Sequence, residues 1–60
     1  MTDSDRASLL NLSPGQEIVI GGEIWFRMDL RNYKVSPEHE EPSDRNSFFV
    51  HVSEIRHNEV

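Results

Sequence analysis

Apolar and polar residues alternate most regularly in residues 15–30, which also hold the densest β-branched and aromatic content of the chain. Such a period of two predicts a half-buried β-strand. From residue 24 onward, the apolar side carries Ile24, Phe26, Met28 and Leu30, and the other side carries Glu23, Trp25, Arg27, Asp29 and Arg31. A shorter run, residues 17–20, precedes Gly21 and Gly22. Because glycine adopts positive φ at little cost, we expect a tight hairpin turn at this pair.

Shorter apolar runs predict three further strands. Residues 8–12 form an edge strand that ends at the turn Ser13-Pro14-Gly15, and a third strand begins at Tyr33 after an interruption at Asn32. Residues 47–55 form the last strand, with apolar groups on both of its sides. A strand that is apolar on both sides is typical of one covered twice, here by a second subunit. We therefore expect an all-β fold, a small five-stranded antiparallel protein.

The domain organisation follows from length and composition. We expect a flexible polar tail at residues 1–7, a single β domain at residues 8–55 with an exposed loop at 36–46, and a short tail at 56–60. A chain of 60 residues buries only about 60% of the surface that its unfolded form exposes. Because the chain has no cysteine, disulfides and thiolate metal sites are excluded, and oligomerisation is the expected source of further burial. The expected homodimer interface consists of Leu9, Leu10, Phe48, Val50 and Val52.

The charge balance limits the function classes. Eleven acidic and six basic residues give a net charge of −5, which argues against non-specific binding of nucleic acid. The single basic grouping along the chain is Arg27, Arg31 and Lys34. The chain has no run of 18 apolar residues and no signal-peptide pattern, so we expect a cytoplasmic protein without a membrane partner.

Candidate chemistry is sparse. Glu38, His39, Glu40 and Glu41 cluster in sequence, but they lie between two prolines, where we expect a solvated loop rather than a metal site. His51 lies in a predicted strand and His57 lies near the end of the chain, so a structural or exposed role is expected for both. No nucleophile–base pair, phosphate loop or zinc spacing is present. The sequence thus predicts a protein that is not an enzyme and binds no metal or cofactor.

Four short motifs follow one another in an order that resembles a known family. They are Gly15-Gln16-Glu17 leading to Ile20-Gly21-Gly22-Glu23, then Asn32-Tyr33-Lys34-Val35, Glu41-Pro42, and Val50-His51-Val52-Ser53-Glu54-Ile55. Between Leu9 and Ile55 the chain resembles the carbon storage regulator family, small bacterial proteins that bind messenger RNA. The resemblance implies two interleaved chains in a β-sandwich homodimer that recognises GGA-containing hairpins. The RNA-binding residues expected on this basis are Leu10, Arg27, Arg31, Lys34, His51 and Ile55.

The chain departs from the family at positions that matter for function. Leu12, Ser13 and Val52 stand where the family carries RNA-contacting arginines, so most of the phosphate attraction is lost. Two hypotheses from different classes follow. The chain is a diverged post-transcriptional regulator that binds mRNA weakly or acts through protein partners, or it is an acidic interaction module or inhibitor that does not bind RNA.

Overall fold

The central hairpin forms where the alternation predicts it. The computed structural model describes residues 1–56, and in it β1 (Glu17–Ile20) and β2 (Glu23–Arg27) pair antiparallel. Gly21 and Gly22 form the turn with φ of 57° and 81°. Positive φ at both central residues is the requirement of a type I′ hairpin turn, which explains the glycine pair.

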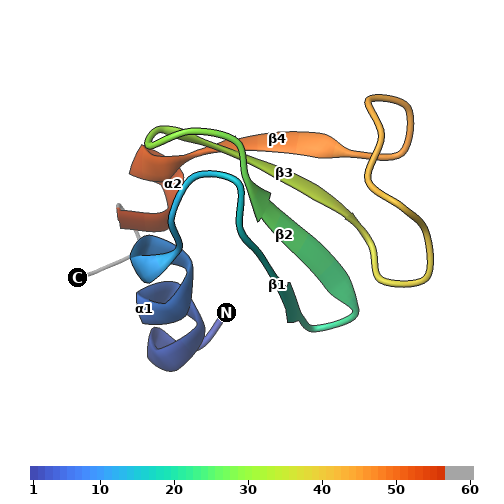
Figure 1. The fold of residues 1–60 in the computed structure, drawn as a ribbon. Coiled ribbons are helices and arrows are strands. Elements are labelled where there is room, and N and C mark those ends of the chain that lie inside the picture. The colour runs from blue at the N-terminus through green and yellow to red at the C-terminus, as the bar shows by residue number, and fades with distance from the viewer. Residues whose placement is uncertain (57–60) are drawn as a thin grey trace.

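Two further strands complete one antiparallel sheet (Figure 1). They are β3 (Asn32–Pro37) and β4 (Phe48–His51), and the strand order is β1-β2-β3-β4. Each strand therefore pairs with its neighbour in sequence, and β1 and β4 are the two edges. The loop of residues 38–47 joins β3 to β4 at the end of the molecule away from the helices.

The N-terminal region forms a helix, so the predicted edge strand at residues 8–12 and the predicted tail at residues 1–7 are wrong. Helix α1 spans Asp3–Asn11. Its start is fixed by a capping box, in which the Thr2 hydroxyl accepts from the Asp5 N–H at 3.0 Å and the Asp5 carboxylate accepts from the Thr2 N–H at 3.4 Å. Each bond satisfies a backbone donor that a helix N-terminus otherwise leaves without a partner.

The last predicted strand, residues 47–55, is a strand only in its first part. After β4 the chain turns into helix α2 (Val52–Arg56), where the Glu54 carboxylate accepts from the His51 N–H at 2.8 Å. With α1 and α2 in place of two predicted strand segments, the sheet of residues 1–56 has four strands rather than five. The rest of the predicted C-terminal tail, residues 57–60, lies outside the described residues.

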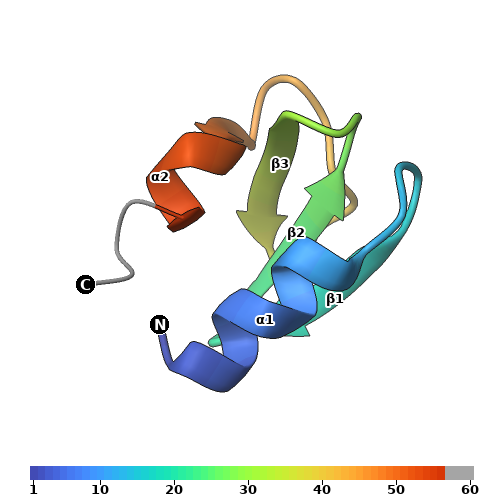
Figure 2. The same ribbon diagram turned by 90° about the vertical axis from the view of Figure 1, so that its left-hand side faces the viewer.

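Both helices lie on the same face of the sheet, and the core lies between them and the strands (Figures 1 and 2). The Tyr33 hydroxyl donates to the Leu9 carbonyl at 2.8 Å, which ties β3 to α1. The Trp25 ring meets the Tyr33 ring edge-on, with 6.4 Å between centroids. Burial raises the pKa of Tyr33, and the positive charges of Arg27 and Arg56 oppose this shift. The buried apolar residues are Leu9, Trp25, Tyr33, Val35, Val52 and Ile55.

The face of β2 that packs on this core is the side that the sequence makes polar. Trp25 and Arg27 are only 8% and 4% exposed. Phe26 is half-buried on the opposite face, and Met28 and Leu30 lie beyond the end of β2 and are exposed. The strand therefore turns its Trp25 side toward the helices, and a largely apolar face is left without a helix over it.

Candidate functional site

Arg27, a predicted RNA-binding residue, is a structural residue. Its Nη1 donates to the carbonyls of Leu10 and Leu12 at 3.0 and 2.6 Å, and its Nη2 donates to the Leu30 carbonyl at 2.9 Å. Its Nε donates to the Asp29 carbonyl at 3.3 Å. The guanidinium also lies over the Tyr33 ring, 5.2 Å from its centroid. At 4% exposure the side chain is not placed to contact a phosphate.

Three other predicted RNA-binding residues are also engaged within the fold. Ile55 is 3% exposed, and Leu10 lies on α1, partly buried against the core. Lys34 is half-buried, with its Nζ 3.2 Å from an Asp44 carboxylate oxygen. The RNA-binding set expected from the sequence is thus divided between the core and the surface.

The remaining two predicted residues, Arg31 and His51, come together. They line one shallow depression, between the β2–β3 turn and the start of α2, with Leu30, Val52, Ser53 and Arg56. The Arg31 carbonyl accepts from the Val52 N–H at 2.6 Å, which holds the turn against α2. Arg56 is the functional candidate that sequence reasoning missed. Its position in a five-residue helix that follows β4 directly left no periodic signal.

Of the described residues that line the depression, Arg31 and Arg56 are basic and none is acidic. Within residues 1–56, neither Arg31 nor Arg56 has a carboxylate oxygen within 4.0 Å. Hydrogen bonds from the backbone of Arg31 and from Asn32 hold the pKa of the Asp29 carboxyl below its usual value. The His51 Nδ1 accepts from the Ser53 N–H at 3.1 Å, so in the neutral ring the proton lies on Nε2. Two guanidinium groups and this imidazole form a surface suited to an anion such as a phosphate or carboxylate.

The uncovered face of the sheet is the second candidate surface. The cross-strand register places Val19 beside Ile24, and Phe26 and Phe49 on either side of Lys34. Val19 is 52% exposed and Phe49 is 55% exposed, while the others are half-buried. We call these five residues the open face.

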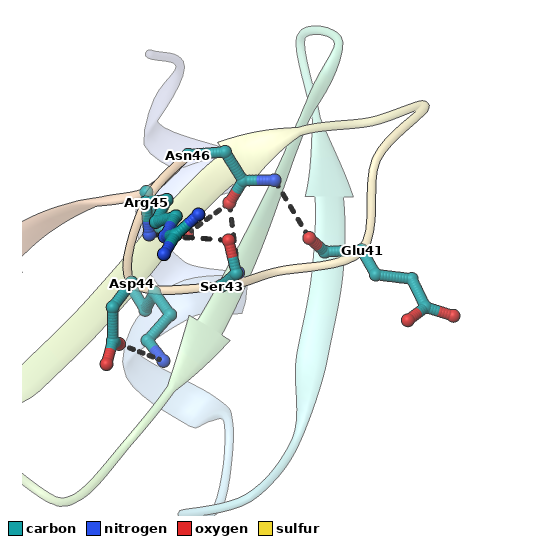
Figure 3. Close-up of polar contacts among 7 residues, drawn as sticks. Glu41, Ser43, Asp44, Arg45 and Asn46 are labelled. Carbon is teal, nitrogen blue, oxygen red and sulfur yellow. Dashed lines mark hydrogen bonds and ion pairs between the residues drawn. The ribbon is translucent and has the colours of Figure 1, made fainter.

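The loop of residues 38–47 borders the open face, because its Asp44 carboxylate lies 3.2 Å from the Lys34 Nζ. Figure 3 shows the polar contacts within this loop. Asn46 organises the loop: its Oδ1 accepts from the Ser43 N–H at 2.9 Å, and its Nδ2 donates to the Glu41 carbonyl at 2.9 Å. Within the predicted loop of residues 36–46, Ser36 and Pro37 belong to β3, Ser36 is only 2% exposed, and most of the other residues are exposed. The loop thus presents the exposed carboxylates of Glu38, Glu40 and Glu41.

Part of the predicted dimer interface is buried within the single chain. Leu9 and Val52 are 0% and 7% exposed within the single chain, so they are core residues and offer nothing to a second subunit. Leu10 and Val50 are partly buried against the same core. Phe48, with 53% of its surface exposed, is the member of the set that remains most available to a partner.

Comparison with models of protein families, with curated proteins and with solved structures gives no match to this chain. Among residues 1–56, no three His, Asp or Glu side chains come together in a way that would hold a metal ion. No helix in that part of the chain is both long and apolar enough to cross a membrane.

We predict that Arg27→Lys destabilises the fold by about 2–4 kcal/mol, because lysine keeps the charge but cannot reach four carbonyls from one planar group. Urea unfolding followed by circular dichroism measures the change, with Arg45→Lys as the control on the exposed loop. The control should lie within about 0.5 kcal/mol of the wild type. An Arg27→Lys protein as stable as the control would contradict the structural role.

Proposed function

We propose that this protein is a non-catalytic protein-binding module and that its open face docks on a partner protein. The observation that carries the proposal is the row of Phe26, Lys34 and Phe49 across three adjacent strands, with Val19 and Ile24 beside it. Protein interfaces are enriched in aromatic residues at the centre and depleted of charge there. The one lysine of the row is paired with Asp44, so the centre of the surface is close to neutral.

The rim of the open face supports a particular kind of partner. Glu17 lies directly beside Phe26 in the register and is exposed, and the bordering loop carries Glu38, Glu40 and Glu41. An apolar centre with an acidic rim matches a protein surface that has apolar pockets surrounded by lysine and arginine. Such charge complementarity speeds association and selects partners more than it adds affinity. The proposal therefore favours a basic partner protein, as for an inhibitor that occupies a basic groove.

Affinity capture from the native host tests this proposal with two matched variants. Val19→Glu places a charge on the open face, and Leu30→Glu places the same charge on the β2–β3 turn, at a residue that is 67% exposed. We expect a partner retained by the wild type and by Leu30→Glu to be lost with Val19→Glu. In a titration with that partner, the Val19→Glu variant should bind at least about tenfold more weakly, as expected for a charge desolvated without a counterpart. Equal retention by all three baits would contradict the proposal.

A second candidate function is weak mRNA binding by a diverged regulator, and the grouping of Arg31, His51 and Arg56 favours it. Two arginines offer two phosphate contacts, which supports weak, salt-sensitive binding. In this proposal the RNA lies against the depression rather than on the core residues Arg27 and Ile55. The acidic loop and net charge of −5 oppose it, which is why it ranks below protein binding.

A gel-shift titration of a GGA-containing hairpin RNA at low salt tests the second candidate. We expect Arg31→Ala combined with Arg56→Ala to weaken binding and to flatten the log–log salt slope by about 1.4, since each single-strand phosphate contact contributes about 0.7. Arg45→Ala is the matched control. The absence of a shift at low salt up to roughly 100 μM protein would exclude RNA as the ligand. The Kd would then exceed roughly 100 μM, which corresponds to a free energy of binding weaker than about −5.5 kcal/mol.

A further inference from the structure

The free edge of the sheet at β4 is short, but it lacks the proline and the charged side chains that often keep an edge strand from pairing. Within Phe48–His51 there is no proline, no lysine and no other fully charged side chain. Two consecutive phenylalanines, Phe48 and Phe49, are 53% and 55% exposed, one on each face of the sheet. An exposed, apolar edge strand without such protection is a template for pairing with another strand.

The hydrogen-bond pattern determines which backbone groups this edge offers. The Val52 N–H donates to the Arg31 carbonyl, so in the antiparallel register the pairs Tyr33–Val50 and Val35–Phe48 are the hydrogen-bonded ones. The alternate pair, Lys34–Phe49, is not hydrogen-bonded. The N–H and C=O of Phe49 therefore point away from β3, toward the free edge.

We propose that the occupant of this edge is a second copy of the chain, with β4 pairing antiparallel to the partner's β4 around a twofold axis at Phe49. In this register the two Phe49 residues exchange both backbone hydrogen bonds, and their rings meet on the open face. On the other face Phe48 lies opposite the partner's Val50. The cross-strand pairs at the centre of the contact between the two β4 strands are thus apolar on both faces of the sheet. Such pairs are what stabilise a sheet.

The neighbouring register is less suitable. Side chains opposite one another must share a face of the sheet. The twofold axis can therefore pass through a residue of β4 but not between two residues. Centred on Val50, the pairing would set Phe49 opposite the partner's His51 and Phe48 opposite a residue of α2. The N–H of His51 is already bonded to Glu54, which ends the free ladder at that residue and favours the register centred on Phe49.

Charge complementarity supports the second copy as the occupant. The antiparallel arrangement places the His51 end of β4 next to the partner's residue 47 and the loop before it. The depression with Arg31 and Arg56 lies at the His51 end of β4. The loop of residues 38–47 lies at the Phe48 end, and its four carboxylates and one arginine give a formal charge of −3. The twofold axis brings these opposite charges together twice, which compensates part of the repulsion between two chains of charge −5.

Phe49→Glu tests the dimer, and Val19→Glu distinguishes it from the protein-binding proposal, whose open face also includes Phe49. We expect light scattering of the wild type to give twice the 7.0 kDa mass of one chain. The measurement is made at about 100 μM protein, so that a dimer with a weak dissociation constant is also detected. Phe49→Glu sets two carboxylates directly opposite each other and should raise the dimer dissociation constant at least about tenfold. Val19→Glu is the matched control, since Val19 is 52% exposed on the same face of the opposite edge. The Val19→Glu variant should remain dimeric. The protein-binding proposal predicts that the same variant no longer binds the partner protein.

A cysteine cross-link keeps the proposal falsifiable if Phe49→Glu fails to fold. The chain contains no cysteine, so a single introduced thiol can form only an intermolecular disulfide. Opposed residues of a hydrogen-bonded antiparallel pair have Cα atoms about 5.5 Å apart, within disulfide range. Phe49→Cys should therefore cross-link on mild oxidation, and Val19→Cys should not. A monomeric wild type, a dimeric Phe49→Glu variant, or equal cross-linking at both positions would overturn the proposal.

Discussion

The structure depends on the burial of one guanidinium group. Arg27 donates hydrogen bonds to four backbone carbonyls, two from the end of α1 and the residue after it and two from the β2–β3 turn. A buried charge is costly unless its donors are satisfied. Because the end of α1, the residue after it and the β2–β3 turn supply these acceptors, Arg27 of β2 ties the N-terminal helix to the sheet. The ring of Tyr33 beneath it adds a cation–π contact.

This one orientation determines what the rest of the molecule can do. Side chains of a strand alternate between faces, so an inward Arg27 requires an inward Trp25 and an outward Phe26. The register then carries the same division to β1 and β4 and leaves Val19 and Phe49 exposed. The open face and the β4 edge are thus consequences of how the core is built. The proposals for a protein partner and for a twofold dimer both start from this division.

The sequence allowed some of this architecture to be predicted, and the failures have physical causes. Gly21 and Gly22 marked the hairpin because positive φ is a local requirement that only glycine meets easily. Helix α1 was missed because Arg6 and Leu9 are its buried residues, which gives no apolar stripe; the Thr2–Asp5 capping box was the one signal of it. The inward side of β2 was missed because a binary pattern places arginine in solvent. Arg27 is tolerated in the core only through carbonyls that are 15 and 17 residues away in sequence.

The candidate sites were only partly predictable, because the sequence does not show where β4 ends and α2 begins. Arg31 and His51 both belong to the predicted RNA-binding set and line one depression, and Arg56 joins them because the chain leaves β4 and turns into α2. A strand continued through residue 55 would have carried Val52 and Ile55 along the sheet. Instead, α2 buries both of them against Leu9. Local propensity alone does not show where a strand ends when packing against a distant helix decides it.

The fluorescence of tryptophan most directly tests which face of β2 is buried. Trp25 is the single tryptophan of the chain and is 8% exposed. Our account predicts that its emission is blue-shifted relative to the urea-unfolded chain and that acrylamide quenches it weakly. In a Trp25→Phe/Phe26→Trp variant the tryptophan lies on the open face, and quenching should rise clearly while the protein stays folded. A native Trp25 quenched as strongly as in the unfolded chain, or more strongly than a tryptophan at position 26, would contradict the account.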